Sequence, residues 1–420
     1  MKVCVIGNGG REHALAWRLS ISPSVTKVYA IPGSAAMSDC AELVGIDWQQ
    51  SDHLIRFLKD NHVDLVVVGP EAPLVAGLSD ALSAAGIPVF GPSKAAAQLE
   101  GSKVFAKDLM KKYNIPTAAY GVFHNVDEAK EFIAQTGAPI VVKADGLAAG
   151  KGVVVAMTIE EANAAVEDML SGNRFGEAGS TVVIEEFMEG EEASLLAFVD
   201  GKTVVPMIAS QDHKRIFDGD KGPNTGGMGT YAPAPVLTDA LRDEAMKTIL
   251  EPMVAAMEKE GMPYVGCLYA GLMITPQGPK VVEFNARFGD PETQVVLPLL
   301  DSDLGQIMMA CATGTLTADM VKWKDSSAAC VILASKGYPE TSSKGDVIHG
   351  DIKQHDTTIV FHSGTKLIGD EYVTNSGRVL GVVGLGKDLR TALDRAYERI
   401  EHIDFEGMQY RTDIGAKAFK

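Results

Sequence analysis

The sequence has few cysteines, no long apolar run and no excess of positive charge. Its five cysteines form no Cys-x-x-Cys pair and lie mostly among apolar residues, which predicts reduced thiols in a cytoplasmic protein. No apolar run approaches about 18 residues and no signal-peptide pattern opens the chain, so we expect no membrane contact. The net charge of −17 argues against binding to nucleic acid.

The composition is that of a globular enzyme. The chain has 420 residues, 46% of them hydrophobic and 22% charged, which is enough for two to four domains and a large core. Neither an exposed heptad pattern nor a long apolar edge is evident, so we expect a monomer. The sequence contains no internal repeat.

The segment KVVEFNARFGDPETQ, residues 280–294, is the strongest candidate for a functional site. Its apolar residues predict a strand, and alternate residues on one face are polar: Glu283, Asn285 and Arg287. Such groups are costly to bury unless they bind something, and oxygen ligands beside a guanidinium suit a Mg²⁺ or Mn²⁺ ion that carries phosphates. A self-satisfied Glu–Arg pair explains the three residues equally well. The carboxylate-rich turn that follows, residues 289–292, favours a site.

Residues 2–6 predict a strand that leads through GNGGREHAL into a helix, a phosphate-binding arrangement. A dinucleotide fold is disfavoured because Glu12 replaces the third glycine and the second strand ends at Ile31 and Pro32 without a ribose-binding acid. Strands at 64–69 and 87–91 complete a small parallel α/β sheet. Glycine turns follow all four strands, which predicts a pocket at one edge of this sheet.

A second domain is predicted to begin near Gly101 with a helix over 102–114. The strand PIVVKA carries Lys143 and leads into DGLAAGKGVVVA, a glycine-rich flap suited to closing over a polyphosphate. It is not a P-loop, because GxxxxGK[ST] is absent. The acidic connection from Glu185 to Glu192 offers hydrogen-bonding groups for an adenine edge and a ribose.

The polar segment 210–235, SQDHKRIFDGDKGPNTGGMGTYAPAP, is too long for an idle loop. Its mixture of charged and amide side chains predicts substrate recognition. Helices are expected over 238–260 and 292–314, and strands with a helix from Asp388 to about His402 predict a last, small α+β domain.

Together these features predict ATP-dependent activation of a substrate. Six motifs, in order and over nearly the whole chain, resemble the phosphoribosylamine glycine ligase (glycinamide ribonucleotide synthetase) family of ATP-grasp enzymes: GNGGREHALAW, VGPEAPLVAGL, GPSKAAAQLEGSK, KADGLAAGKGV, SQDHKRIFDGDKGPNTGGMG and EFNARFGDPETQ. The resemblance implies an α/β domain (1–100), an ATP-grasp core (101–320) with a lid at about 116–188, and an α+β domain (321–420). It also implies that glycine attacks ATP to give glycyl phosphate, which 5-phosphoribosylamine converts to glycinamide ribonucleotide.

The resemblance implies roles for single residues. Arg287 and Lys143 would be catalytic, and Glu283 and Asn285 would hold Mg²⁺ or Mn²⁺. The ATP-binding residues would be Lys103, Lys143, Gly150, Lys151, Gly152, Glu185, Glu186, Phe187 and Glu192. The substrate-binding residues would be Gly9, Gly10, Arg11, Asp212, Lys214, Asn224, Thr225, Asp290, Pro291 and Glu292.

One departure and two alternatives remain. Ser34 stands where the family has Asn after Pro32 and Gly33, and serine can replace its hydrogen bonds. Another ATP-grasp ligase, such as a carboxylase, is the nearest alternative, but the GNGGREH and 210–235 segments belong to the acceptor side. A module that binds ATP without turnover is disfavoured by Arg287 beside the metal ligands.

Overall fold

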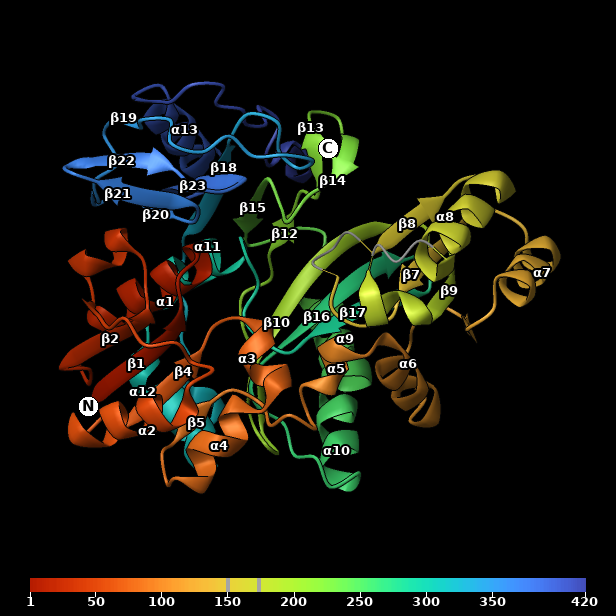
Figure 1. Ribbon diagram of the computed structural model, residues 1–420, viewed down its shortest axis with the longest axis horizontal. Coiled ribbons are helices and arrows are strands. Elements are labelled where there is room, and N and C mark those ends of the chain that lie inside the picture. Colours follow the sequence, from red (N-terminus) through yellow and green to blue (C-terminus); the bar gives the residue numbers. More distant parts are fainter. Residues whose placement is uncertain (149–151, 172–174) are drawn as a thin grey trace.

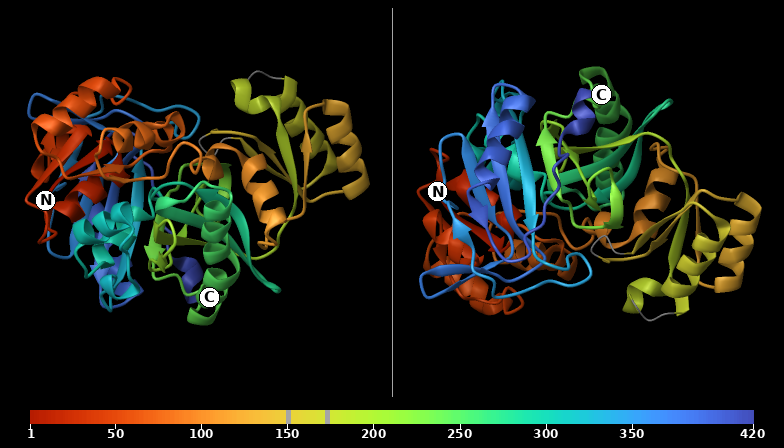
Figure 2. Two further views of the ribbon diagram at one scale, coloured as in Figure 1. Left: turned by 90° about the horizontal axis from the view of Figure 1, so that it is seen from below. Right: turned by 90° about the horizontal axis from the view of Figure 1, so that it is seen from above.

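The computed structural model describes residues 1–148, 152–171 and 175–420. Figure 1 shows the first hundred residues, in red and orange, beside a central block in green, with the blue segments above them. A yellow part projects to one side, and both further views keep it apart from the rest (Figure 2). The molecule therefore consists of a main body and a projecting lid.

The first domain is built on a parallel sheet with the order β3-β2-β1-β4-β5. Its strands are β1 (Lys2–Gly7), β2 (Lys27–Pro32), β3 (Glu42–Leu43), β4 (Leu65–Val68) and β5 (Val89–Phe90). Its helices are α1 (Gly10–Ser20), η1 (Ala35–Asp39), α2 (Ser51–Asp60), α3 (Glu71–Ala76), α4 (Leu78–Ala84) and α5 (Gln98–Gly101). β4 is buried throughout, as an apolar strand covered on both faces should be. The predicted α/β sheet is confirmed, with the short edge strand β3 in addition.

The lid is a four-stranded sheet with the order β6-β9-β7-β8, covered by two helices. Its elements are β6 (Tyr120–Phe123), α7 (Val126–Thr136), β7 (Ile140–Ala144), β8 (Val153–Ala156), α8 (Ile159–Ser171), η2 (Gly176–Ser180) and β9 (Val182–Glu186). Helix α6 (Lys103–Lys112) precedes it, and the Ser102 hydroxyl caps this helix by accepting a hydrogen bond from Phe105 N. The lid has a small apolar core of its own, separate from the cores of the main body.

The central block contains an antiparallel sheet with the order β11-β10-β16-β17. Its strands are β10 (Glu191–Asp200), β11 (Val204–Pro206), β16 (Val265–Thr275) and β17 (Gly278–Asn285). The predicted helix over 238–260 is a continuous run of α9 (Asp239–Ala245), the π-helical turn η3 (Met246–Leu250) and α10 (Glu251–Lys259). A shared apolar core joins these elements to the first domain, so the site between them has rigid walls.

The last sheet, with the order β12-β15-β18-β23-β20, combines strands from two distant parts of the chain. Its strands are β12 (Gln211–Asp212), β15 (Gly229–Ala232), β18 (Ser327–Ala334), β20 (Thr358–His362) and β23 (Arg378–Gly386). Helix α13 (Leu389–Ile400) covers it, as predicted. The segment 210–235, expected as a loop, therefore supplies two strands to this sheet and also forms the hairpin of β13 (Arg215–Phe217) and β14 (Lys221–Asn224).

The remaining elements connect these parts. They are α11 (Thr293–Val296), η4 (Leu297–Leu299), α12 (Leu304–Thr313), η5 (Ala318–Met320), β19 (His349–Gly350), β21 (Thr365–Ile368), β22 (Glu371–Thr374), β24 (Ile403–Asp404) and η6 (Ala416–Phe419). Within the described ranges, no helix is long and apolar enough to cross a membrane.

Candidate active site

The strand predicted over 281–287 ends earlier, at Asn285, so Arg287 lies just beyond β17. Its guanidinium nevertheless turns back to the strand, and Nη2 donates to Asn285 Oδ1 over 3.3 Å. Glu283 lies opposite Gly271 and Asn285 opposite Tyr269 on β16. The polar residues are therefore neighbours as expected, although Arg287 is placed by the turn and not by strand register.

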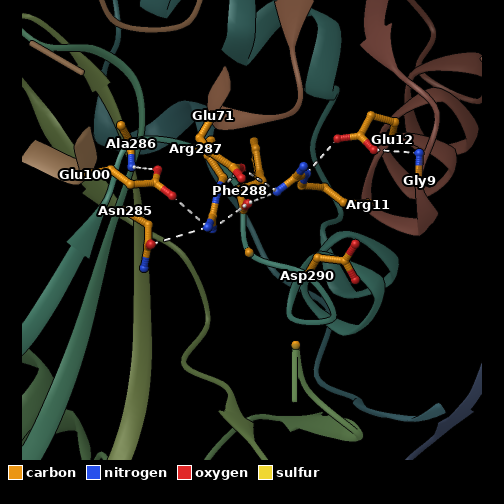
Figure 3. A network of polar contacts seen from close by, with 12 residues as sticks. Gly9, Arg11, Glu12, Glu71, Glu100, Asn285, Ala286, Arg287, Phe288 and Asp290 are labelled. Carbon is orange, nitrogen blue, oxygen red and sulfur yellow. Dashed lines mark hydrogen bonds and ion pairs between the residues drawn. The ribbon is translucent and has the colours of Figure 1, made fainter. Parts of the chain in front are cut away.

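Two carboxylates hold the Arg287 guanidinium (Figure 3). Nη2 lies 2.8 Å from Glu100 Oε1, and Nε lies 3.2 Å from Glu71 Oε2. Burial by itself would lower the pKa of Arg287, but Glu100 and Glu71 outweigh it and raise that pKa. Burial raises the pKa of Glu100, whose second oxygen accepts a hydrogen bond from Ala286 N. Neither acid was predicted, although Glu71 and Glu100 both belong to quoted motifs, VGPEAPLVAGL and GPSKAAAQLEGSK.

Glu283 differs from these acids because its carboxylate has no hydrogen bond or ion pair with any residue that the structure describes, whereas its backbone pairs with Gly271. Burial would raise its pKa, but the cations of Lys214, Lys143 and Lys103 outweigh burial and lower the pKa instead. The charges of three lysines thus favour the ionised carboxylate, although none of them forms an ion pair with it among the described residues. A carboxylate oxygen beside an amide oxygen fits the ligand preference of Mg²⁺ and Mn²⁺. No group of three or more His, Cys, Asp or Glu side chains able to hold a metal occurs in the described ranges, so ATP and water would complete the coordination.

Lys143 lies on β7 and points to Glu185 on β9, and both side chains are buried. Its Nζ is 3.0 Å from Glu185 Oε2, which also lies 3.2 Å from the Nζ of Lys107. Burial lowers the pKa of Lys107 to about 8. The other oxygen, Glu185 Oε1, is buried without a partner in the described part of the chain. The sequence analysis missed Lys107, although it lies one helical turn after Lys103 on α6.

Lys103 lies near this pair at the start of α6. Its Nζ donates to Gly146 O over 3.0 Å, and its backbone N–H donates to Asp145 Oδ1 over 2.6 Å. Burial lowers the pKa of Lys103, opposed by Glu283. Of the predicted flap residues, Gly150 and Lys151 lie outside the described residues. Gly152 is buried, and its carbonyl accepts a hydrogen bond from Ala144 N.

The 210–235 segment reaches the nucleotide side of the site through Lys214. Its Nζ lies 2.7 Å from Oε2 of Glu192, which is half-buried at the start of β10. Burial would lower the pKa of Lys214, but Glu192 and Asp212 outweigh it and raise that pKa well above its usual value. Burial raises the pKa of Asp212 to about 7, with Lys214 opposing and Glu292 adding to the rise.

Other predicted residues lie around these. Thr225 donates to the Lys214 carbonyl through both its N–H and its hydroxyl, over 2.7 and 2.8 Å. Glu292 is buried and accepts a hydrogen bond from Tyr269 OH over 2.6 Å. Glu186 is exposed and Phe187 half-buried after β9. Asn224 pairs with Arg215 across the β13–β14 hairpin.

In the glycine turn before α1, one backbone N–H group is already bound by a side chain of that helix. Gly9 N donates to Glu12 Oε2 over 2.8 Å, and Arg11 Nε lies 2.6 Å from Glu12 Oε1 (Figure 3). The residue that replaces the third glycine of a dinucleotide motif therefore caps this helix. Arg11 also donates to Phe288 O, which brings the first domain to the Arg287 turn.

Gly10 lies against two polar side chains that the sequence analysis did not find. They are Ser363, in the turn after β20, and Gln294 on α11; Ser363 Oγ and Gln294 Oε1 are buried without a partner in the described ranges. Gln294 Nε2 donates to Asp290 Oδ1 over 2.9 Å, and Arg378 Nη1 lies 3.4 Å from the same oxygen. Pro291 follows and packs against Gly227. Ser34 Oγ is likewise buried without such a partner.

The fold and this site define the chain as an ATP-grasp enzyme: a parallel-sheet domain, a lid that carries the buried Lys143, and a strand with a carboxylate and an amide that ends just before Arg287. Family models for the N, ATP-grasp (A) and C domains of phosphoribosylglycinamide synthetase match residues 1–100, 101–293 and 328–417. The chain therefore belongs to the phosphoribosylglycinamide synthetase family, and it is a ligase.

Individual relatives agree with this assignment. Phosphoribosylamine–glycine ligase of Halalkalibacterium halodurans is 53% identical over 418 residues, covering 100% of this chain and 97% of the relative. That of Neisseria meningitidis serogroup A is 53% identical over 421 residues, covering 100% and 99%. The crystal structure of phosphoribosylamine–glycine ligase from Thermotoga maritima matches with a TM-score of 0.86 and 34% identity, covering 99% of this chain and 100% of that one.

A protein outside this family has a similar fold at low sequence identity. The biotin carboxylase domain of 2-oxoglutarate carboxylase from Hydrogenobacter thermophilus matches with a TM-score of 0.75 at 16% identity, covering 97% of this chain and 91% of that one. The family model of residues 101–293 and the Thermotoga maritima structure confirm the predicted ATP-grasp architecture.

Proposed function

We propose that this site joins glycine to 5-phosphoribosylamine with ATP, through glycyl phosphate. The family assignment makes the chain a ligase of this type in purine synthesis. The observation that carries the proposed site is the Glu283 carboxylate, two residues before Asn285 on β17, which has no hydrogen bond or ion pair in the described ranges and whose pKa the charges of Lys214, Lys143 and Lys103 lower. A surplus of positive charge around one free oxygen ligand suits a metal nucleotide.

The first step is phosphoryl transfer to glycine. A glycine carboxylate oxygen attacks the γ-phosphorus, the bond to the β-phosphate oxygen breaks, and ADP leaves with that electron pair. Lys103 and Lys143 bind the phosphate oxygens, and Arg287 neutralises the charge that develops on the transferred group. The Glu71 and Glu100 carboxylates fix the guanidinium beforehand, so little reorganisation is needed at reaction.

The second step forms the amide. The phosphoribosylamine nitrogen attacks the glycyl carbonyl carbon, and the bond from that carbon to the phosphate oxygen breaks. Phosphate leaves with the electron pair and takes up the proton that the nitrogen loses. Asp212, Lys214 and Glu292 surround the place where glycine would lie. Gly9, Gly10, Arg11, Asn224, Thr225, Asp290 and Pro291 would bind the phosphoribosylamine, with Ser363 and Gln294 as further polar groups.

The nucleotide would lie between the lid and the central sheet. Glu185 keeps one buried oxygen free for it, and Glu186 and Phe187 provide the backbone segment along an adenine edge. Glu192 would accept the ribose hydroxyls, and the flap with Gly150, Lys151 and Gly152 would cover the phosphates. Mg²⁺ or Mn²⁺, held by Glu283 and Asn285, would neutralise phosphate charge and orient the γ-phosphate.

The test is ADP release from Mg-ATP by the purified protein with glycine, with and without phosphoribosylamine formed in place from ribose 5-phosphate and ammonia. We expect release that requires both substrates, together with glycinamide ribonucleotide in the mass spectrum. Equal turnover with bicarbonate or another amino acid in place of glycine would contradict the proposal.

We also propose three properties that this assay does not address. The protein would work in the cytoplasm, which its five unpaired cysteines favour. It would be a monomer, which sedimentation velocity tests. Its domains would meet near residues 100 and 320, which the ranges of the three family models support.

A further inference from the structure

The β13–β14 hairpin belongs to no larger sheet. Within the part of the chain that the structure describes, its two strands pair only with each other. The register shifts between Arg215 and Phe217, and the Phe217 side chain is exposed. A two-stranded hairpin on its own is only marginally stable in water. Side-chain contacts from elsewhere in the molecule must therefore fix the position of this hairpin.

Arg411 supplies the main contact. Its side chain is only 1% exposed, and its guanidinium joins the hairpin to the segment that follows β24. Nε and Nη2 pair with the two carboxylate oxygens of Asp413, over 2.7 and 2.8 Å. Nη1 donates to Asp220 Oδ1 in the hairpin turn over 2.9 Å and to the Arg215 carbonyl over 3.2 Å.

The neighbours of Arg411 reinforce this contact along the whole hairpin turn. Thr412 N donates to Asp218 Oδ1 over 2.8 Å, and Gly219 N donates to Asp413 Oδ2 over 2.9 Å. Lys417 Nζ lies 2.8 Å from Asp220 Oδ2. Segment 411–417 therefore binds the hairpin turn through several hydrogen bonds and ion pairs.

The same segment is anchored in the last domain. Tyr397, on α13, donates from its hydroxyl to the Arg411 carbonyl over 2.8 Å and accepts from Ile414 N over 3.2 Å. Gly415 N also donates to His213 Nε2 over 3.3 Å, just before the hairpin. The hairpin is thus tied to α13 through a short chain of specific contacts.

Three predicted substrate-binding residues, Lys214, Asn224 and Thr225, lie at the base of this hairpin. Lys214 directly precedes Arg215, and the Lys214 carbonyl accepts two hydrogen bonds from Thr225 just after β14. The Lys214 ammonium ends on Glu192. A shift of the hairpin would move this ammonium and the Asn224–Thr225 pair relative to the central sheet.

We propose that Arg411 is a positioning residue for the ligation: it touches no substrate but holds Lys214, Asn224 and Thr225 in register with Asp212 and Glu292. This inference rests on the proposed function, because it assigns those loop residues to the glycine and phosphoribosylamine sites. Misplacement by about 1 Å at such a site typically costs about 10²-fold in rate.

The test compares Arg411→Met, Arg411→Lys and Asp220→Asn with Arg399→Met. Arg399 is a matched control because it is also a buried arginine of the last domain, pairs with Asp351 and donates to the Lys353 carbonyl, and has no contact with the hairpin among the described residues. Asp220→Asn is the mild variant: Asn tolerates the positive φ of 55° at this position, and the Arg411–Asp413 pair stays intact.

For each variant we would measure kcat/KM for glycine and for phosphoribosylamine, the Kd for a non-hydrolysable ATP analogue, and the thermal midpoint. We expect Arg411→Met to lower kcat/KM for both substrates about 10-fold or more. Asp220→Asn and Arg411→Lys should give smaller losses, between the wild type and Arg411→Met, because the asparagine side chain keeps an acceptor and the lysine side chain keeps a charge. The Kd for the analogue should change less than kcat/KM does, because the lid and the central sheet supply the other proposed nucleotide contacts. Arg399→Met should lower the thermal midpoint but keep the kinetic constants.

Wild-type kinetics in Asp220→Asn and in the folded fraction of Arg411→Met would overturn the inference, as would equal losses in Arg399→Met. If Arg411→Met does not fold, Asp220→Asn decides alone. An inactive wild-type protein would instead contradict the proposed function, so the two failures are distinguishable.

Discussion

The Glu283 carboxylate makes no hydrogen bond or ion pair with another residue that the structure describes. Glu283→Ala should therefore leave the fold intact, because no protein hydrogen bond is lost, and should lower the ligation rate at least about 10²–10³-fold. Assay of the rate together with the thermal midpoint and Mn²⁺ binding by electron paramagnetic resonance checks this. An unfolded variant whose folded fraction ligates and binds Mn²⁺ normally would show that the metal assignment is wrong.

Glu185 is the opposite case, a buried carboxylate that two buried ammonium groups share. Glu185→Ala leaves Lys107 and Lys143 without their carboxylate, and loss of one partner from a buried pair typically costs about 3–5 kcal/mol. Urea denaturation should show this loss in the free energy of unfolding. Glu167→Ala is the matched control, because its pair with Lys130 is exposed and should contribute less than about 1 kcal/mol. Equal effects of the two substitutions would contradict the prediction.

At the scale of elements, the start of α1 packs directly against the turn between β20 and β21. A Cβ atom on Gly10 would overlap the Ser363 hydroxyl and lie 3.0 Å from Gln294 Nε2. Gly10→Ala should thus force the Ser363 hydroxyl to turn away or the two elements to move apart, at a cost of about 1 kcal/mol in the free energy of unfolding. Ser363→Gly in the same chain removes the overlapping atoms and should restore most of that loss. Additive effects in this double-mutant cycle would show that the contact is not the cause.

The elements also show how far sequence patterns reach. Apolar periodicity and glycine turns predicted the first parallel sheet, α6, β7, β9 and α13 because these follow local rules. Arg287 was expected on a strand that ends at Asn285, since a strand pattern does not show where pairing stops. Glu71, Glu100, Ser363 and Gln294 were missed because each acts across a long stretch of sequence, and only the folded chain brings them to Arg287 and Gly10.

At the scale of the whole molecule, the first and last domains meet through buried histidines. His13 on α1 accepts a hydrogen bond from His362 N on β20 over 3.0 Å, and the two rings are 5.8 Å apart. Burial, and secondarily His362, lowers the pKa of His13 to about 3, and burial lowers that of His362 to about 4. Both rings are therefore neutral in the folded protein at neutral pH.

This interface should make the molecule sensitive to acid. Below the ordinary pKa of 6.5, the unfolded chain binds protons that the folded one does not, so stability is fully present above that value and falls towards about pH 4. His13→Asn keeps an acceptor for His362 N and should reduce the slope of stability between pH 6.5 and 4 by about one proton, or about 1.36 kcal/mol per pH unit. Urea denaturation at several pH values measures the slope. The exposed His53→Asn serves as control, and an unchanged slope in His13→Asn would contradict the prediction.

The sheet that mixes distant strands bears on synthesis of the chain at the ribosome. β15 (Gly229–Ala232) pairs with β12 and with β18 (Ser327–Ala334), and β18 in turn pairs with β23 (Arg378–Gly386). Pairing between strands so far apart in sequence forms slowly, and strand edges left open meanwhile favour aggregation. The nascent chain can complete its first parallel sheet early, whereas the loop that bears Lys214 has to wait for strands translated much later. The active site therefore reaches its final structure only after β18 and β23 have been translated, although Lys214 and Glu283 precede both strands in the sequence.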